Sequence, residues 1–336
     1  MKAIVNHRGN VKVADEPLPV LQSRFVLVKS VYSAISPGTE LTAIRRMPEQ
    51  QASLGYSAAG IAVKVGAEVE GIREGQQVAC YGGPYVKHAE YLLVPKHLVV
   101  PVPDTVSLLD ASTAGLGAIA IHALRQADLR FGESVVIIGL GILGQIIARI
   151  AHAACLKVIA CDLLPERREA LAGIEGIRVC SSVDDIAKEA AAATSGLGAD
   201  CVIHCAAGRQ MQLMDESFGW IRDRGKILIV GDMHMEFTRS KMFHKEAQVL
   251  ISRAGGPGRY DPLYERDGYD YPPGYVRWTE ERNLAEYIRL LTERRIDVSR
   301  LITDQVAIGD AWKVYEKYKN NPADVLGAVI SYSSGS

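Results

Sequence analysis

The chain has 336 residues, of which 48% are hydrophobic and 23% are charged, and its formal net charge is −1. These proportions are those of an ordinary globular protein, long enough for two domains. Because no basic excess exists to neutralise phosphates, we expect no nucleic-acid partner and no membrane partner. No apolar run reaches the ~18–20 residues that span a bilayer, and the amino-terminal residues predict a first strand rather than a signal peptide.

The six cysteines contain no C-x-x-C pair, and several of them lie inside apolar strand patterns. This usage favours reduced, buried thiols that serve packing. We therefore expect a cytoplasmic protein.

Residues 1 to about 105 carry short apolar segments separated by Gly/Pro turns, a pattern typical of a small β-barrel or sandwich. The predicted strands cover residues 25–31, 58–65, 77–80, 89–94 and 98–100. Residues 108–127 then predict two helices, broken around Gly115-Leu116-Gly117.

Strands and helices alternate after residue 130, which predicts a parallel sheet with right-handed crossovers. The expected strands are residues 134–138, 157–161, 177–180, 200–204, 226–230 and 247–252. The expected helices between them are residues 142–154, 165–172, 183–194 and 210–222. The predicted fold class is therefore α/β, a doubly wound Rossmann sheet combined with a β-rich unit.

A glycine-rich turn follows the first of these strands and opens directly into a helix, which is the required context of the G-x-G-x-x-G fingerprint. Gly139 permits the tight turn, Gly141 lets the backbone approach a pyrophosphate, and Gly144 lets the helix pack closely. The helix N-terminus adds free N–H groups and partial positive charge. We expect the dinucleotide to contact Gly139, Leu140, Gly141, Ile142, Leu143 and Gly144.

Asp162 ends the next strand, where an acidic side chain accepts hydrogen bonds from the adenosine ribose and repels a 2′-phosphate. This favours NAD(H) over NADP(H). Arg167 and Arg168 follow closely and favour the phosphate instead, so the choice stays open. The competing structural interpretation is a glycine turn that binds nothing.

Two further strand ends are rich in turn residues, at 204–208 and 230–232. Ligands of doubly wound sheets bind at the carboxyl ends of the strands, near the topological switch point. Cys205, Ala206 and Gly231 are therefore expected on the nicotinamide side of the cofactor.

Five of the fourteen tyrosines fall within residues 255–278, here called the tyrosine-rich segment. One interpretation is a sugar-binding wall that includes Tyr260, Tyr275 and Arg277. A subunit interface is the equal alternative, because Tyr, Trp and Arg are enriched there. Helices at 279–294 and 310–319 follow, and a final strand at 325–332 is expected to return to the first domain.

Three segments resemble the medium-chain dehydrogenase/reductase family, the zinc alcohol dehydrogenase superfamily. Residues 34–40, AISPGTE, resemble its C-G-T-D segment. Residues 54–66, LGYSAAGIAVKVG, resemble its G-H-E-x-x-G-x-V-x-x-V-G segment. Residues 88–95, HAEYLLVP, resemble its A-E-Y-x-x-V-P strand. The resemblance implies a GroES-like catalytic domain at 1–117 and 272–336, a dinucleotide domain at 118–271, and a homodimer or homotetramer. Residues 36–40 and 256–280 also resemble a branch sometimes fused to a second, sugar-oxidoreductase-type domain.

The metal ligands implied by the resemblance are replaced in this chain. Pro37 stands at the position of the first Cys, Tyr56 and Ser57 stand at the His-Glu pair, and Gly115 or Gly117 falls near the last ligand. Proline and glycine side chains cannot bind zinc, and tyrosine or serine rarely does. No counterpart of the family's four-cysteine structural zinc lobe follows Glu90. We therefore expect no zinc.

Without a metal, another group must take the hydroxyl proton as hydride leaves carbon. Tyr56 is the first candidate, and filling of the vacated metal position is its alternative. The resemblance implies that Thr39 contacts the substrate oxygen, and Ser36 is expected at the substrate as well. Glu40 is either a substrate contact or a member of a salt bridge, and His88 is either a base or a satisfied polar residue. His122 and His204 are expected to pack in the interior.

These observations predict a zinc-independent, NAD(H)-dependent dehydrogenase that interconverts a secondary alcohol and a ketone. The expected substrate is a small polyhydroxylated molecule such as a sugar, nucleoside sugar or cyclitol. One alternative is a zinc-free enoyl or quinone reductase of the same superfamily. Another is a nucleotide-binding sensor or scaffold that has lost catalysis.

Overall fold

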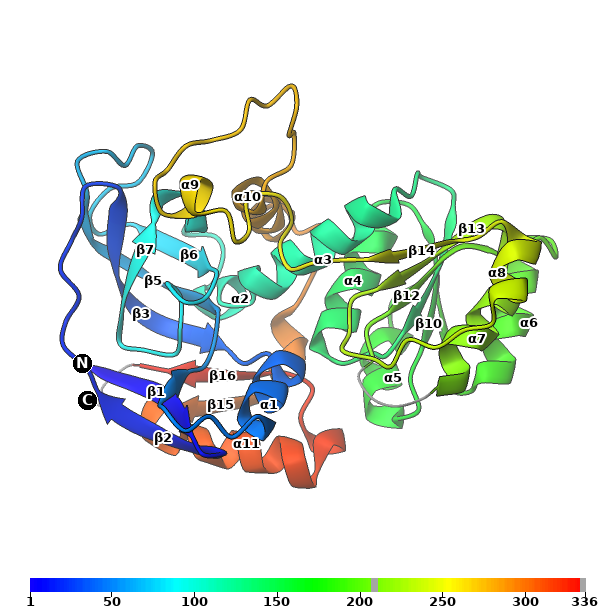
Figure 1. The fold of residues 1–336 in the computed structure, drawn as a ribbon, viewed down its shortest axis with the longest axis horizontal. Coiled ribbons are helices and arrows are strands. Elements are labelled where there is room, and N and C mark those ends of the chain that lie inside the picture. Colours follow the sequence, from blue (N-terminus) through cyan, green and yellow to red (C-terminus); the bar gives the residue numbers. More distant parts are fainter. Residues whose placement is uncertain (207–210, 333–336) are drawn as a thin grey trace. The chain divides into compact units, whose positions relative to one another are not determined.

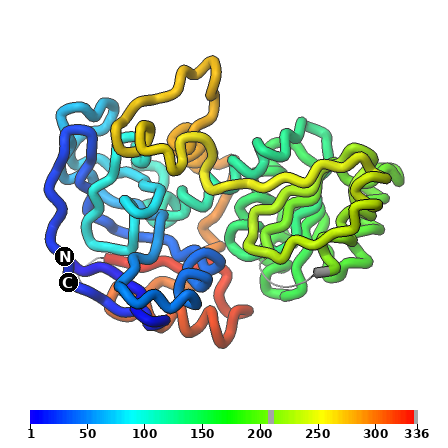
Figure 2. The backbone as a smooth tube through the Cα atoms, in the orientation of Figure 1, coloured from blue at the N-terminus to red at the C-terminus, as the bar shows by residue number. Residues whose placement is uncertain are grey.

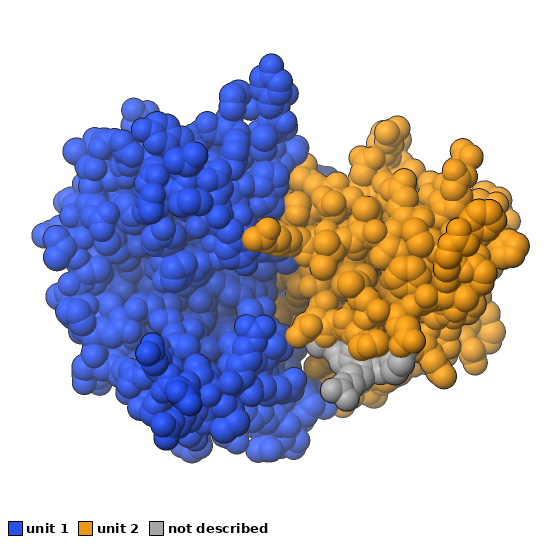
Figure 3. Space-filling view, viewed as in Figure 1, with its two compact units in different colours: residues 1–119, 254–336 blue, residues 120–253 orange. Residues whose placement is uncertain are grey.

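The computed structural model describes residues 1–206 and 211–332. The chain divides into two compact units, unit 1 with Met1–Ile119 and Ala254–Ser336 and unit 2 with Ala120–Arg253 (Figure 3). Both the blue amino-terminal part and the red carboxy-terminal part of the chain belong to unit 1 (Figure 2). The predicted division ended the dinucleotide domain at residue 271, whereas the structure assigns residues 254–271 to unit 1.

Unit 1 contains a small sheet and a larger, mostly antiparallel sheet (Figure 1). The small sheet has the order β2-β1-β4, formed by β1 (Lys2–His7), β2 (Asn10–Asp15) and β4 (Ala52–Ser53). The larger sheet has the order β15-β16-β3-β5-β6-β8, with β7 paired to β3. Its strands are β3 (Phe25–Ala34), β5 (Ser57–Val65), β6 (Gln77–Tyr81), β7 (Tyr91–Pro95), β8 (Val99–Pro101), β15 (Asp304–Ala307) and β16 (Ala328–Ser331).

The expected return of the chain end to the first domain is confirmed, because β16 pairs antiparallel with β3. Helices α10 (Glu280–Thr292) and α11 (Ala311–Asn320) confirm the two predicted carboxy-terminal helices. Single 3-10 turns lie at Lys96–Leu98, Ser299–Leu301, Ile308–Asp310 and Pro322–Asp324.

The expectation of an all-β amino-terminal region is wrong at one place, helix α1 (Pro37–Arg45). Proline at the first helical position has a suitable φ and lacks only an N–H that would be unpaired there. The Glu40 carboxylate accepts a hydrogen bond from the Ser36 backbone N–H at 2.7 Å, which satisfies one free donor of the helix start. The segment that resembles a family motif is therefore also a helix N-terminus.

The predicted helix break around residues 115–117 is also wrong. The break lies at Ser112 and Thr113, between α2 (Leu108–Ala111) and α3 (Ala114–Ala127), so both glycines are inside α3. A Cβ at Gly117 would lie 2.1 Å from the Tyr287 ring. Close packing against rings, rather than a turn, explains these glycines.

Unit 2 confirms the predicted Rossmann sheet (Figure 1). Its strands run parallel in the order β11-β10-β9-β12-β13-β14, which corresponds to the doubly wound order 3-2-1-4-5-6. They are β9 (Ser134–Ile138), β10 (Lys157–Cys161), β11 (Ile177–Cys180), β12 (Ala199–His204), β13 (Ile221–Ile229) and β14 (Gln248–Ile251).

The helices of unit 2 match the predicted alternation, with one addition. They are α4 (Ile142–Ala153), α5 (Pro165–Ala172), α6 (Val183–Ala193), α7 (Met211–Trp220) and the unpredicted α8 (Arg239–Lys245). The predicted start of the fourth helix at 210 and the end of the turn at 207–208 lie outside the described residues. Helix α7 ends at Trp220 and β13 begins directly after it, earlier than predicted.

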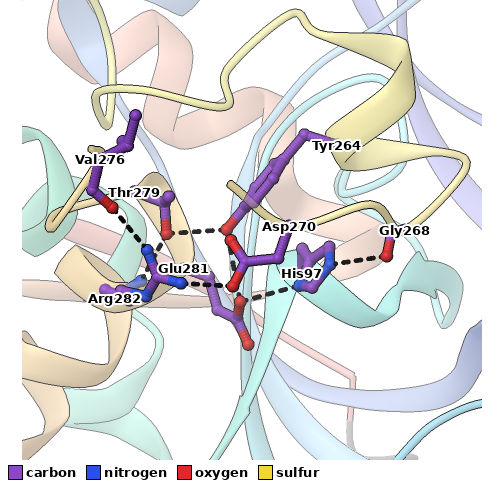
Figure 4. A network of polar contacts seen from close by, with 8 residues as sticks. All are labelled: His97, Tyr264, Gly268, Asp270, Val276, Thr279, Glu281 and Arg282. Atoms are coloured by element: carbon purple, nitrogen blue, oxygen red, sulfur yellow. Dashed lines mark hydrogen bonds and ion pairs between the residues drawn. The ribbon is translucent and has the colours of Figure 1, made fainter. Parts of the chain in front are cut away.

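The tyrosine-rich segment is anchored to unit 1 rather than separate from it (Figure 4). The His97 ring stacks on the Tyr264 ring, with centroids 4.5 Å apart, and its Nδ1 lies 2.8 Å from Glu281 Oε2. Its Nε2 lies 3.1 Å from the Gly268 carbonyl oxygen. Both ring nitrogens of His97 therefore lie within hydrogen-bond distance of an oxygen atom.

Helix α9 (Pro262–Glu265) lies within the segment, and Asp261 caps it by accepting a hydrogen bond from the Leu263 N–H. All six cysteines are free thiols. Across residues 1–206 and 211–332, the structure contains no helix with the length and apolar character that a membrane crossing requires.

Candidate active site

Three of the predicted site residues meet at the start of α1. The Tyr56 hydroxyl donates a hydrogen bond to Ser36 Oγ at 2.7 Å, and Thr39 also hydrogen-bonds the phenol. Burial raises the pKa of Tyr56, while the hydrogen bonds with Ser36 and Thr39 oppose the rise. The phenol is therefore protonated near neutrality and is placed to give a proton to an acceptor.

A buried polar network lies behind this group. The Glu40 carboxylate accepts hydrogen bonds from the Tyr315 hydroxyl and, at 3.0 Å, from His88 Nε2. His88 Nδ1 lies 2.6 Å from Ser33 Oγ, which lies 2.6 Å from the Tyr332 hydroxyl. Both Glu40 and His88 are buried, and the His88 ring is bonded on one side to Glu40 and on the other to Ser33. Of the two interpretations of Glu40, the structure favours an internal pair, with His88 as its partner.

Tyr56 also belongs to an aromatic cluster that sequence reasoning did not find. The Tyr81 ring lies edge-on to the Tyr56 ring, with centroids 6.0 Å apart. The Arg259 guanidinium lies 5.8 Å from the centroid of Tyr81 and 4.1 Å from the centroid of Tyr260. Arg259 therefore brings Tyr260, a predicted substrate residue, to the cluster that contains Tyr56.

Arg259 is itself held by two contacts and is not a free cation. Its guanidinium donates to the Glu265 carboxylate and to the Gly83 carbonyl oxygen. Tyr275, by contrast, is 91% exposed, and Arg277 stacks on Trp278 at 4.0 Å. In the described part of the chain, neither Tyr275 nor Arg277 has a hydrogen bond or ring contact with the Tyr56 cluster.

The resemblance implies that four positions of this chain lack the family's metal ligands. The residues that stand near these positions make other contacts. Ser57 Oγ donates to the Ser112 carbonyl oxygen and accepts from the Gly115 N–H at 2.8 Å. A Cβ at Gly115 would lie 2.8 Å from Tyr81 Cδ2, and one at Gly117 would meet the Tyr287 ring. Within residues 1–206 and 211–332, no group of three or more His, Cys, Asp or Glu is arranged to hold a metal ion. The residues present do not fit a zinc.

The glycine turn of unit 2 has the geometry that a dinucleotide needs. Gly139 has φ +91°, and a Cβ on it would lie 2.6 Å from the Ala206 nitrogen. A Cβ on Gly144 would lie 1.9 Å from the Gly139 carbonyl oxygen, so this helix can pack here only with glycine. Gly141 has open space around its Cβ position and caps α4 without a side-chain hydrogen bond. Free N–H groups and open space at this turn fit a pyrophosphate.

Leu140 and Ile142 turn their side chains into the interior, so they can offer only backbone groups to a ligand, whereas Leu143 is half-buried. Asp162 supports the same turn, because its Oδ2 accepts from the Leu140 N–H at 2.7 Å. Its Oδ1 accepts from the Leu164 N–H at 2.9 Å. A carboxylate has about four acceptor positions, so Asp162 keeps capacity for a ribose hydroxyl.

Two arginines lie beside Asp162. Arg167 approaches Asp162 Oδ2 at 3.4 Å, and Arg168 donates to the backbone carbonyl oxygens of Asp162 and Leu163. Arg168 is thus occupied by main-chain acceptors. The Asp162 carboxylate keeps acceptor capacity that these contacts do not use.

The two predicted nicotinamide-side turns lie next to each other. The Cys205 and Ala206 N–H groups both donate to the Ile138 carbonyl oxygen, which ends β9. A Cβ on Gly231 would lie 2.3 Å from the Ala206 carbonyl oxygen. Burial raises the pKa of Cys205 to about 12, so this thiol is neutral and contributes shape rather than charge. Gly231 thus lets the second turn approach the first.

Known proteins resemble this chain over nearly its full length. The protein-family model described as "Zinc-binding dehydrogenase" matches residues 139–266. An uncharacterized zinc-type alcohol dehydrogenase-like protein YdjJ of Escherichia coli is 23% identical, over 99% of this chain and 99% of that protein. The L-galactonate-5-dehydrogenase of E. coli is 25% identical, over 83% of each chain.

The same fold occurs in the solved structure of galactitol-1-phosphate dehydrogenase from E. coli. Its TM-score is 0.80 at 20% identity, and the match covers 99% of this chain and 100% of the other. The likeness confirms the predicted combination of a GroES-like and a Rossmann domain. The family-model match, the relatives and the shared fold together support the resemblance to the medium-chain dehydrogenase/reductase superfamily, the superfamily of the zinc alcohol dehydrogenases.

Proposed function

We propose that the protein is an NAD(H)-dependent dehydrogenase that interconverts a secondary alcohol and a ketone on a polyhydroxylated substrate without zinc. The observation that carries the proposal is the Tyr56–Ser36 hydrogen bond at 2.7 Å, because it fixes the phenol of a residue that, by resemblance, stands at the position of one of the superfamily's metal ligands. The proton that a metal-bound alcohol would lose must pass through such a group.

The dinucleotide would be held by the free N–H groups of the Gly139–Gly144 turn and by Asp162. When bound, its nicotinamide would give or accept the hydride at C4. Tyr56 gives its proton to the ketone oxygen during reduction and takes the alcohol proton during oxidation. Ser36 Oγ, which accepts the hydrogen bond of Tyr56, fixes the direction of the phenol, and after proton transfer its own O–H can turn to donate to the phenolate.

The high pKa of Tyr56 bears on the direction of the reaction. A buried phenol with a raised pKa is a weak acid, but near neutrality it is present almost wholly in the protonated form, which is the form that reduction of a ketone consumes. We therefore propose that the enzyme works best as a ketone reductase near neutrality. Oxidation needs a cation that lowers the pKa of Tyr56, and the positively charged nicotinamide of the oxidised cofactor is such a cation.

Two observations support a polyhydroxylated substrate. The relatives reported above are named for L-galactonate and galactitol-1-phosphate, which both carry several hydroxyl groups. In this chain, Tyr260 stands half exposed beside Arg259 and offers a ring and a hydroxyl to a sugar. The NAD(H) preference rests on Asp162, whose charge opposes a 2′-phosphate.

The test measures NADH and NADPH oxidation with a panel of keto sugars, keto cyclitols, enones and quinones, before and after treatment with a zinc chelator. We expect NADH oxidation with a hydroxylated ketone, unaffected by chelation. Turnover of enones alone would identify the reductase alternative, and activity that returns only with added zinc would reject the metal-free mechanism.

The matched variants are Tyr56→Phe and Tyr269→Phe, the second at an exposed tyrosine whose ring faces Arg24. Loss of a general acid typically lowers the rate about 10²–10⁴-fold. We expect such a loss in kcat for Tyr56→Phe, with NADH binding unchanged, and none for Tyr269→Phe. A Tyr56→Phe variant with the same turnover rate as wild type would refute the role of the phenol as the general acid.

A further inference from the structure

Tyr81, the last residue of β6, is held in one position from several sides. The Tyr56 ring meets it edge-on, and the Arg259 guanidinium lies over its face. A Cβ at Gly115 would lie 2.8 Å from Tyr81 Cδ2, and a Cβ at Gly255 would lie 2.6 Å from Tyr81 Cε1. Two glycines far apart in the sequence therefore leave the space that this one ring occupies.

The hydroxyl of this enclosed ring has no partner. The residue is 2% exposed and its hydroxyl makes no hydrogen bond with any residue of 1–206 or 211–332, yet the hydroxyl oxygen is not completely closed to solvent. Two other interior tyrosines are bonded within the chain: Tyr287 pairs with Thr113 Oγ1 at 2.8 Å and Tyr264 with Thr279 Oγ1 at 2.8 Å. A rigidly held phenol whose unpaired oxygen stays open can bond a group from outside the chain.

The charges around Tyr81 indicate which kind of group this is. Burial and the nearby Glu280 carboxyl raise the pKa of Tyr81, and the Arg259 charge opposes the rise. The phenol therefore stays neutral and can both donate and accept a hydrogen bond. Arg259 is already paired with Glu265, so it offers little attraction to an anion. A neutral hydroxyl group matches these surroundings better than a carboxylate or a phosphate.

We propose that Tyr81 is a substrate-binding residue, whose phenol hydrogen-bonds a substrate hydroxyl on the carbon next to the one that Tyr56 serves. The inference rests on the proposed function, and it narrows the substrate class to a vicinal diol and the corresponding α-hydroxy ketone. The two phenols lie side by side in unit 1, with ring centroids 6.0 Å apart, and so can address two oxygen atoms on neighbouring carbons.

The experiment compares cyclohexane-1,2-diol with cyclohexanol, which lacks only the second hydroxyl. NAD⁺ reduction is measured with wild type, Tyr81→Phe, and the control Tyr287→Phe, in which the lost hydroxyl has an internal partner. An uncharged hydrogen bond of about 1.4 kcal/mol corresponds to 10-fold. We expect Tyr81→Phe to lower kcat/KM for the diol about 10-fold and to leave cyclohexanol unchanged, so that the preference for the diol disappears.

Equal losses on both alcohols would overturn the proposal, as would a Tyr287→Phe variant that loses the preference in the same way. A second measurement distinguishes failure of the Tyr81 proposal from failure of the proposed function. It detects binding of the same two compounds through tyrosine difference absorbance. In one outcome, wild type binds the diol more tightly than cyclohexanol, loses this preference in Tyr81→Phe, and turns over no alcohol or ketone. That result would support the substrate-binding role of Tyr81 and reject the proposed dehydrogenase activity. Equal binding of both compounds by wild type would reject the substrate-binding role of Tyr81.

Discussion

The buried carboxyl of Glu280 leads to a prediction about stability and pH. Glu280 is the first residue of α10 and is 0% exposed. Within residues 1–206 and 211–332, no N–H or O–H donor reaches either of its oxygens, and the Arg259 Nε is 4.0 Å away. Arg259 also serves the buried Glu265 carboxylate, so one cation faces two carboxyl groups.

Burial and the Glu265 charge raise the pKa of Glu280 to about 9, from the ordinary 4.5 of a glutamate side chain, although Arg259 opposes the rise. The helix N-terminus favours the ionised form by only ~0.3–1 kcal/mol, which is small beside a shift of this size. Between pH 4.5 and 9 the folded chain holds a proton that the unfolded chain releases. The free energy of unfolding therefore falls as pH rises, by about 1.4 kcal/mol per pH unit.

The perturbation is Glu280→Gln, because an amide keeps the shape of the protonated carboxyl and cannot ionise. Relative to this variant, wild type should lose about 3 kcal/mol of unfolding free energy between pH 6 and pH 8. Urea unfolding followed by tryptophan fluorescence measures it, with the exposed Glu70→Gln as the control. Equal pH slopes for Glu280→Gln and wild type would refute the assignment of a neutral carboxyl.

Four further predictions concern unit 2. Gly141→Ala should fold normally but bind NADH at least 10-fold more weakly by calorimetry, because its Cβ occupies the space left for the pyrophosphate. Gly144→Ala should lower the Tm, because its Cβ meets the Gly139 carbonyl oxygen. Burial lowers the pKa of His204 to about 4, so wild type should lose up to about 3 kcal/mol of stability as pH falls from 6.5 to 4, and His204→Gln should lose less over that window in urea titrations. Asp162→Asn should reduce the NADH over NADPH preference in kcat/KM by about 10-fold or more, and an unchanged ratio would contradict the role of its charge.

The dinucleotide half could be predicted almost completely from the sequence, because its signals are local. Four apolar β-branched residues end at Gly139, and Asp162 ends the next strand, so both motifs lie within short stretches of chain. Helix α8 was missed because Arg239–Lys245 has no buried residue and therefore no apolar periodicity. The second domain boundary was missed because the tyrosine-rich segment carries no regular pattern, and only its contacts show where it belongs.

The arrangement of unit 1 around Tyr56 was harder to predict, since it depends on contacts between distant parts of the chain. The resemblance pointed to Ser36, Thr39 and Tyr56, and the structure brings all three together. Tyr81 ended an apolar strand like any core residue, and nothing local showed that Arg259 would lie on its ring. Gly115 and Gly117, at the predicted helix break, were the one available signal, because glycines in an otherwise helical pattern often mark close packing.

Gly115 and Gly117 also restrict how this chain can change over time. Placing a cysteine or histidine at Gly117 would push its Cβ into the Tyr287 ring, and at Gly115 into Ser57 as well as the Tyr81 ring. A larger residue at either position therefore requires a neighbouring side chain to become smaller or to move, and a smaller neighbour on its own leaves a cavity and lowers stability. At least two changes are thus needed before a side chain of the kind that binds metals can stand at either position.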